Sequence, residues 1–342
     1  MYYAGLDVSL NDTFVSIIDE DGKIVAEENV VTNVDALSAY LKKINVPFKR
    51  IGIESGQLSI SLCKGLSKKE LPIICVDARH MATALSSRIN KNDRNDARGI
   101  AQMVRAGLYK EVHIKSDEIC EIKLILGSRR QLVQTKIKLM GTIRGLLKIY
   151  GLKVGTQAKF CDKVRSLIQP LSSVVSSPIE ALLSCLEKQE ESFNELHQML
   201  LDIGKKDEDC MHLMTIPGVG IITAMTYKVT IDHPERFKHS ESVGAYLGLT
   251  PKQYASGDVN RHGSISKRGS SECRRLLYEA AQSLLVHVKA SSKLKAWGLK
   301  LIKKKGRKKA IVAVARKLAI LMHRMLMNKK DFCDKAYHTS NN

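Results

Sequence analysis

Two aspartates stand three residues apart in the stretch KNDRNDARGIAQMV, residues 91–104, where a helical pattern begins. Residues i and i+3 are neighbours on a helix surface, so Asp93 and Asp96 would share one face and repel each other. A purely structural interpretation makes Asp93 an N-cap and Asp96 a first-turn acid favoured by the helix dipole. The alternative is that the two carboxylates bind a cation together.

Two more carboxylates fit the second interpretation. Asp7 interrupts the apolar strand pattern of GLDVS, and Glu54 ends the strand pattern of IGIES. Glu54 could simply close a strand at the surface, but an acid inside an apolar strand is harder to explain structurally. Carboxylates from three elements could converge on Mg²⁺ or Mn²⁺, which prefer oxygen ligands. Two such ions about 4 Å apart can stabilise both the attacking and the leaving oxygen of a phosphodiester.

The elements that must position these acids follow a recognisable order. Residues 2–31 are predicted to form three meandering strands with a tight hairpin at Asp21-Gly22. The next predicted elements are a helix over 34–45, a strand over 50–55, a helix over 59–70, a strand over 71–78, and a helix from Asp93 to about Arg105. This order predicts an α/β unit, a mixed sheet flanked by helices, in which the strands of Asp7 and Glu54 are neighbours.

The centre of the chain is predicted to be an antiparallel helical hairpin. One helix covers 118–148 and another 179–203, with a Pro/Ser turn over 169–178 between them. The second helix carries residues spaced alternately three and four, which is a heptad seam: Ile179, Leu182, Leu186, Gln189, Phe193, Leu196, Leu200 and Ile203. Such a coiled-coil seam can be internal or can dimerise.

The remainder is predicted to be mostly helical and strongly basic. The turn IPGVG (216–220) joins two helices, the stretch 252–271 is a polar loop, and a basic run over 300–310 precedes an apolar helix. The whole chain has 342 residues and a formal net charge of +20. From Pro251 onward there are 22 Lys and Arg against 5 Asp and Glu. This excess favours a polyanion such as nucleic acid, although a solvated basic tail would have the same composition.

Other features exclude several classes of protein. Eight cysteines without a CxxC pair predict neither a zinc site nor a disulfide framework, and favour a reducing cytoplasm. The opening MYYAGLDVSL has no signal-peptide pattern, and no run of about 18 apolar residues predicts a membrane span.

Five stretches, taken together and in order, resemble the DEDD transposases of bacterial and archaeal insertion sequences, a family that includes the pilin-gene invertase Piv. They are GLDVS, IGIES, KNDRNDARGIAQ, IPGVGIITA and SGDVNRHGSISKRGSSECRRLLYEAA. The resemblance covers about residues 2–290. It implies an RNase H-like (RuvC-like) metal-binding nuclease domain over 1–115, an oligomerising coiled-coil hairpin over 116–207, and a C-terminal transposase domain over 208–342. The family's four acids fall on Asp7, Glu54, Asp93 and Asp96.

The resemblance also implies a serine nucleophile, which falls on Ser256 before Gly257. A serine hydroxyl needs a base or a metal to become reactive. Ser264, Ser266, Ser270 and Ser271 lie close by, and the residues alone do not separate them. This chain departs from many relatives at Ala255 and Asp258, which leaves the loop's detailed contacts open.

Cations near both constellations are candidates for binding nucleic acid. They are Lys91, Arg94, Arg98, Arg261, Lys267, Arg268, Lys303, Lys304, Lys305, Arg307, Lys308 and Lys309. The partners implied by the resemblance are donor and target DNA, an element-encoded structured RNA, and further copies of this chain as a dimer or tetramer.

The predicted function is therefore a transposase-recombinase that uses Mg²⁺ or Mn²⁺. Three alternative functions fit the sequence as well. A site-specific invertase would have the same residues, a RuvC-type junction nuclease would need the acids but no serine, and a basic binding protein would need neither.

Overall fold

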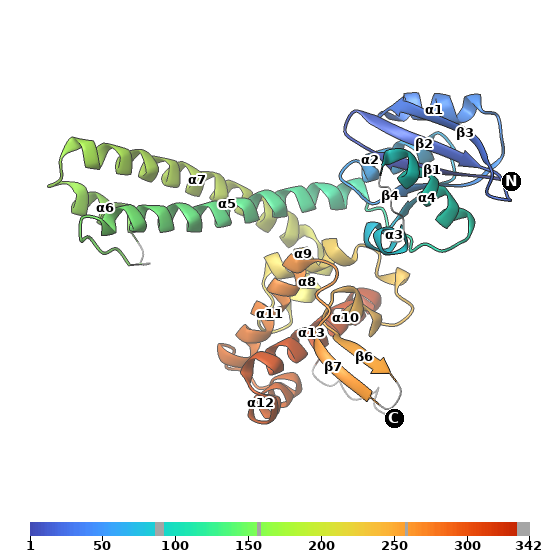
Figure 1. Ribbon diagram of the computed structural model, residues 1–342. Coiled ribbons are helices and arrows are strands. Elements are labelled where there is room, and N and C mark those ends of the chain that lie inside the picture. Colours follow the sequence, from blue (N-terminus) through green and yellow to red (C-terminus); the bar gives the residue numbers. More distant parts are fainter. Residues whose placement is uncertain (86–91, 156–158, 257–258, 334–342) are drawn as a thin grey trace. The chain divides into compact units, whose positions relative to one another are not determined.

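The computed structural model describes residues 1–85, 92–155, 159–256 and 259–333. The chain divides into two compact units, Met1–Ser116 and Asp117–Asn342 (Figure 1).

The first unit is built on a five-stranded mixed sheet. Its strands are β1 (Tyr2–Val8), β2 (Asp12–Ile18), β3 (Ile24–Val31), β4 (Phe48–Glu54) and β5 (Ile73–Val76), in the spatial order β3-β2-β1-β4-β5. The first three strands are antiparallel, and β4 and β5 add in parallel. The predicted mixed α/β unit is therefore confirmed, including the adjacency of the strands that carry Asp7 and Glu54.

Helices cover both faces of this sheet. Helices α1 (Val34–Lys43) and α2 (Ser59–Lys68) bury Leu37 and Leu66 in a core with Leu6 and Ile53. On the other face, α3 (Ala78–Leu85) and α4 (Asp93–Arg105) bury a smaller cluster, made by Tyr3, Ile18, Val76, Met81, Ile100, Ala101 and Val104. Helix α4 begins at the predicted residue. Helix α3 was not predicted; its start is capped by Asp77, whose Oδ1 accepts from the backbone N–H groups of Arg79 and His80 at 3.0 Å.

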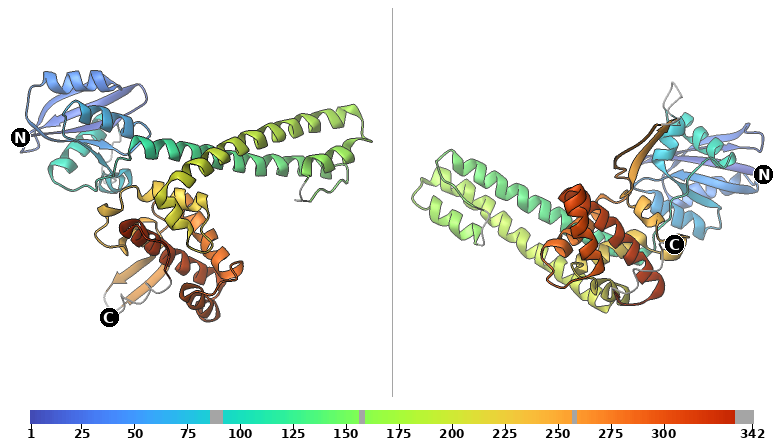
Figure 2. Two further views of the ribbon diagram at one scale, coloured as in Figure 1. Left: turned by 180° about the vertical axis from the view of Figure 1, so that it is seen from behind. Right: turned by 90° about the horizontal axis from the view of Figure 1, so that it is seen from below.

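The second unit begins with two long antiparallel helices, α5 (Asp117–Lys148) and α7 (Ser173–Lys206) (Figures 1 and 2). A short helix, α6 (Phe160–Ile168), packs against α7 and shares a core with it and α5. Two long helices lie where the hairpin was predicted, and its coiled-coil character stays a prediction. The turn expected over 169–178 is wrong beyond Ser172. Helix α7 begins at Ser173 and continues through Pro178, which lies inside the helix and does not end it.

The other helices of the second unit enclose its largest core. They are α8 (Glu208–Met214), α9 (Ile221–Ile231), α10 (Ser242–Tyr246), α11 (Ser271–Val286), α12 (Lys293–Lys305) and α13 (Arg307–Asn328), with a short 3₁₀ turn at Pro234–Arg236. Tyr227 is fully buried, and its hydroxyl donates to the Ala319 carbonyl at 2.6 Å. In the IPGVG turn, a Cβ at Gly218 would lie 2.9 Å from the Ala280 carbonyl oxygen, so this glycine lets the turn contact α11.

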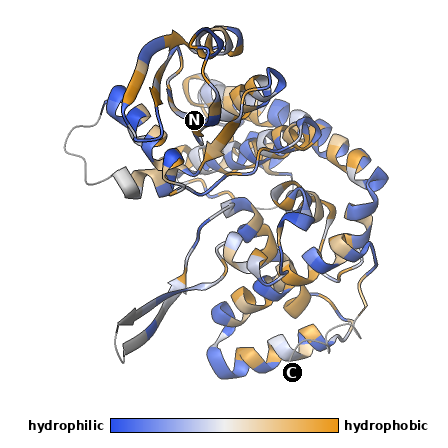
Figure 3. Cartoon of the chain, turned by 90° about the vertical axis from the view of Figure 1, so that its right-hand side faces the viewer, coloured by the Kyte–Doolittle hydropathy of each residue, from blue (hydrophilic) through white to orange (hydrophobic). Residues whose placement is uncertain are grey.

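A two-stranded hairpin replaces the polar loop that the sequence predicted. Its strands are β6 (Pro251–Ser256) and β7 (Val259–Ile265), antiparallel to each other. Figure 3 shows hydrophilic residues along the described parts of these strands. The pattern gave no strand signal because the residues described at 251–254, Arg261, Gly263 and Ser264 are exposed, and of those described only Ile265 packs against the core.

Within the described residues, none of the helices combines the length and the hydropathy that crossing a membrane requires.

Candidate functional site

The face of the sheet under α4 carries both strand acids. Side chains alternate along a strand, so Asp7 shares a face with Gly5, and Glu54 shares one with Gly52. A Cβ at Gly5 would lie 2.1 Å from the Ala97 carbonyl oxygen, and one at Gly52 would lie 2.5 Å from a methyl of Val104. Both glycines therefore face α4, and Asp7 and Glu54 lie on that same face two residues further along.

Helix α4 runs antiparallel to β1. Near its end, the Gln102 side chain donates to the Gly22 carbonyl at 2.7 Å, and Arg105 donates to the Glu20 carbonyl at 2.8 Å. The loop of Glu20 and Gly22 lies beside the start of β1, because Ile18 pairs with Tyr3. The start of α4 therefore points toward the end of β1, where Asp7 lies.

This register brings the four acids toward one place. Asp93 precedes Ala97 by one helical turn, about 6 Å, while Asp7 follows Gly5 by about 6.6 Å in the same direction. The second pair of acids follows the same rule. A Cβ at Gly52 would lie 3.0 Å from a methyl of Ile100. Asp96 precedes Ile100 by one turn, and Glu54 follows Gly52 by two residues in the same direction. Backbone placement thus sets Asp93 toward Asp7 and Asp96 toward Glu54. On position alone, the prediction of a shared site is consistent with the fold.

The beginning of α4 is well defined. The Asn92 side chain caps it by accepting from the Asn95 backbone N–H at 2.8 Å, and Asp93 and Asp96 occupy the first turn, where the helix dipole favours negative charge. The capping residue is therefore Asn92 and not Asp93. This removes the structural explanation of Asp93 as an N-cap.

The carboxylate oxygens do not yet form a closed ligand set. No three of the four acids, all within the described residues, have ligand atoms that lie within 4.8 Å of one another. Asp7, Glu54 and Asp96 are partly buried, and Asp93 is exposed. Carboxylate oxygens from two strands of the sheet and from the helix packed on it suit a hard divalent cation in their chemistry.

Ser256 stands at the tip of the hairpin in the second unit. It is the last residue of β6, and its backbone pairs with Val259 of β7. Gly257 and Asp258 lie outside the described residues. Among the other candidate serines, Ser264 is in β7, and Ser270 caps α11 by accepting from the Cys273 N–H at 3.2 Å.

The base of this hairpin is fixed by contacts that the sequence did not predict. One guanidinium nitrogen of Arg274 donates to the carbonyls of Leu247, Arg268 and Gly269. A Cβ at Gly248 would lie 2.3 Å from the Arg268 carbonyl oxygen, so the two ends of the hairpin can approach only at a glycine.

Comparison with known proteins identifies the family. A model of IS110-type DEDD transposases matches residues 4–151, and the model described as "Transposase IS116/IS110/IS902 family" matches residues 210–296. This chain belongs to the DEDD insertion-sequence transposases. The family consists of enzymes that cut and rejoin DNA strands.

The individual relatives agree with this assignment. The chain is 29% identical over 341 residues to the transposase for insertion sequence element IS1111A of Coxiella burnetii, covering 96% of this chain and 90% of that protein. It is also 29% identical over 129 residues to the pilin gene-inverting protein of Moraxella lacunata, covering 37% of this chain and 39% of that one. The Thermus thermophilus RuvC structure matches 33% of this chain and all of its own at 13% identity, with a TM-score of 0.27. The mixed α/β sheet therefore rests on the strand order alone, and its RNase H-like character stays a prediction.

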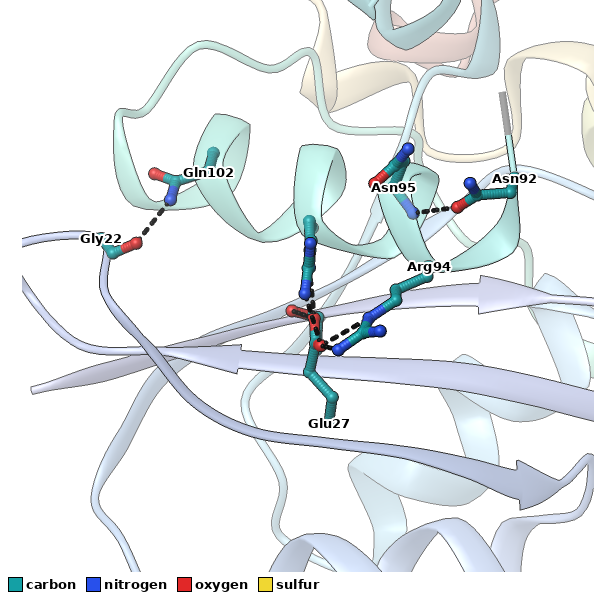
Figure 4. A network of polar contacts seen from close by, with 8 residues as sticks. Gly22, Glu27, Asn92, Arg94, Asn95 and Gln102 are labelled. Atoms are coloured by element: carbon teal, nitrogen blue, oxygen red, sulfur yellow. Dashed lines mark hydrogen bonds and ion pairs between the residues drawn. The ribbon is translucent and has the colours of Figure 1, made fainter. Parts of the chain in front are cut away.

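Two arginines of the transposase that were predicted to face nucleic acid pair with Glu27 of the first unit, although Arg94 stays exposed. Figure 4 shows Arg94 beside Glu27. Arg98 forms a two-bonded fork on the Glu27 carboxylate, with distances of 2.5 and 2.7 Å, and Arg94 Nε donates to the same group at 2.8 Å. These donors hold the pKa of Glu27 down at about 2, although burial opposes the shift. The structure therefore gives both arginines a partner within the chain, and a role in binding DNA stays a prediction.

The remaining predicted cations of the transposase lie in different surroundings. The basic run spans the end of α12 and the start of α13, and Gly306 separates the helices at a φ of +82°. All six of its cations are exposed: Lys303, Lys304, Lys305, Arg307, Lys308 and Lys309. Arg261 is exposed on β7, and Lys267 and Arg268 follow this strand. Lys91 lies outside the described residues.

Proposed function

We propose that this transposase cuts and rejoins DNA with two sets of residues: four acids that hold a divalent cation, Asp7, Glu54, Asp93 and Asp96, and Ser256, whose hydroxyl is the nucleophile. The observation that carries the first set is the antiparallel packing of α4 on Gly5 and Gly52. That packing directs the two acids of the helix toward the two acids of the strands.

Mg²⁺ or Mn²⁺ suits this donor set because all four ligands are carboxylates. When bound, such an ion supplies Lewis-acid stabilisation for the oxygens of a phosphodiester. The carboxylates themselves orient that ion, and α4 fixes two of them relative to the other two. Removal of any one acid leaves the others in place but breaks the set.

Ser256 supplies the covalent step. Its hydroxyl oxygen attacks the phosphorus of a DNA strand, one sugar oxygen leaves that phosphorus, and the serine proton goes to the departing oxygen. A hydroxyl group of the recipient strand then attacks the phosphoserine, and the serine oxygen leaves and regains a proton. Each step exchanges one phosphate ester for another, so joining needs no external energy source.

The basic run and the cations beside the hairpin support a polyanionic substrate, which here is the donor and target DNA. An element-encoded guide RNA and assembly into a dimer or tetramer belong to the same proposal. The long antiparallel pair α5–α7 supplies the surface for assembly, with exposed apolar residues such as Leu124 and Ile137.

The test is a denaturing gel of labelled DNA that carries the element's end, with the element's RNA added. Wild-type protein should leave a covalent protein–DNA adduct that peptide mapping places on Ser256. Ser256→Ala and Asp7→Asn should both lose the adduct and the cleavage, whereas Ser264→Ala should keep them. Cleavage without an adduct in Ser256→Ala would instead identify a RuvC-type nuclease that uses water. A wild-type protein that binds the DNA but never cuts it, together with unchanged DNA binding in Asp7→Asn, would identify a binding protein.

Transposase and invertase differ in their DNA and not in these residues. Recombination assayed on a plasmid with two fixed inverted sites separates them. Inversion without movement of an element would favour the activity named for the Moraxella relative.

A further inference from the structure

Glu27 is a charged side chain that faces inward, on β3 at the edge of the sheet. Its side chain is only 9% exposed. In the register of the sheet, Glu27 pairs with Ser16, and Ser16 pairs with Gly5, so the three residues form one row on the face that carries α4. The row lies two residues before Asp7.

Gly5 and Glu27 contact α4 directly, and Ser16 supports the contact through Glu27. Gly5 admits the helix backbone at Ala97, and the Ser16 hydroxyl donates to Glu27 Oε1 at 3.1 Å. Glu27 in turn receives the fork from Arg98 and the bonds from Arg94. Arg94 lies between Asp93 and Asp96, and Arg98 lies one turn further, so this ion pair is made by the same turns that carry the acids.

We propose that Glu27 is a positioning residue for the metal-binding helix: it fixes the rotation of α4 about its axis and keeps Arg94 and Arg98 away from the four acids. This inference rests on the metal site proposed above. The apolar cluster and the bonds of Gln102 and Arg105 hold the last turns of α4, but its first turns, which carry the acids, could still roll. A two-bonded guanidinium–carboxylate pair on one side prevents this, because its geometry is planar and directional. Without Glu27, the freed guanidinium groups would pair with the nearby carboxylates and compete with the cation.

The experiment measures Mn²⁺ affinity in the full-length protein, by titration with detection of free Mn²⁺ by electron paramagnetic resonance. Glu27→Gln should weaken binding by about tenfold or more, as loss of groups that orient metal ligands does elsewhere. Glu28→Gln is the matched control, because Glu28 is the next residue of β3 and is exposed. It should bind Mn²⁺ like the wild type. Excess Mn²⁺ should restore DNA cleavage in Glu27→Gln, because a weakened site is still present.

Arg98→Gln gives an independent variant in case Glu27→Gln folds poorly. It removes the fork from the helix side and should weaken Mn²⁺ binding in the same direction. Wild-type affinity in folded Glu27→Gln, or in Arg98→Gln, would overturn the inference. Asp7→Asn in the same titration separates the two proposals. If Asp7→Asn binds Mn²⁺ as the wild type does, the proposed metal site is wrong. If Asp7→Asn loses Mn²⁺ affinity but Glu27→Gln keeps it, only the positioning role of Glu27 fails.

Discussion

The α4–sheet contact in the first unit and the β6–β7 hairpin in the second present their reactive residues in opposite ways. Helix α4 lies so close to the sheet that it fills the space of two missing side chains, with its backbone at Gly5 and with the side chains of Ile100 and Val104 at Gly52. The described side chains of the hairpin strands are mostly exposed, and Arg274 and Gly248 make contacts at the base of the hairpin.

The difference matches what each residue type must do. Metal ligands must be held within fractions of an ångström, and dense packing of regular elements supplies that precision. A nucleophile must reach a DNA strand, and the exposed cations Arg261, Lys267 and Arg268 in and beside the hairpin favour the approach of DNA. We infer that the first region sets the geometry of the chemistry and the second supplies access and affinity.

The largest expected effect comes from adding a methyl group between β1 and α4 in the first region. Gly5→Ala places a methyl group 2.1 Å from the Ala97 carbonyl oxygen, so α4 must move. Overpacking of this kind should destabilise the protein by about 3 kcal/mol and remove cleavage with it. Thermal unfolding and the cleavage assay measure both effects.

The control is Gly141→Ala in α5, where an added Cβ meets nothing within 4 Å. It should raise stability by up to about 1 kcal/mol, because alanine favours a helix over glycine. Equal unfolding stability and equal cleavage in the two variants would show that the contact between α4 and the sheet is not tightly packed.

A smaller effect should come from charge in the second region. Neutralising Lys303, Lys304 and Lys305 should reduce the slope of log K against log salt by about 2.7 units on duplex DNA, if each contacts a phosphate. Neutralising the exposed Lys42, Lys43 and Lys68 of the first unit should leave the slope unchanged. Equal slopes in the two triple variants, measured by fluorescence anisotropy, would remove the assignment of affinity to the second region.

The smallest effect concerns pH and Glu27. Its pKa falls from the ordinary value of 4.5 to about 2, chiefly because Arg98 donates to the charged form. A lowered pKa contributes stability that is complete above about pH 4.5 and is lost as the pH falls through about 2. The difference in unfolding midpoint between wild type and Glu27→Gln should therefore shrink between pH 4.5 and 2. A difference that stays constant over this range would argue against the ion pair.

Much of the first region could be predicted from the sequence. Asp21-Gly22 marked the hairpin between β2 and β3, and apolar runs marked β4 and β5, so the neighbouring positions of Asp7 and Glu54 followed from strand order. The start of α4 was also predictable, because the acids and the apolar positions after them have helical spacing.

Contacts between distant residues were not predictable in the same way. Glu27 precedes Arg94 by 67 residues, and only the fold brings them together. One signal was present: Arg94 and Arg98 are four residues apart on one face of α4, which is the spacing that a single buried carboxylate can join. The hairpin was missed because its sequence, PKQYAS and VNRHGSI, has no regular alternation of apolar and polar residues.

The central claim is that Asp7, Glu54 and the turn of Asp93 and Asp96 surround one metal ion. Iron-directed cleavage of the protein tests it most directly: Fe²⁺ replaces Mg²⁺, ascorbate and peroxide are added, and mass spectrometry locates the backbone cuts. The account predicts cuts near residues 7, 54 and 93–96 together, all absent in Asp7→Asn and present in the exposed control Asp12→Asn. Cuts at only one of these three segments, or cuts that persist in Asp7→Asn, would contradict it.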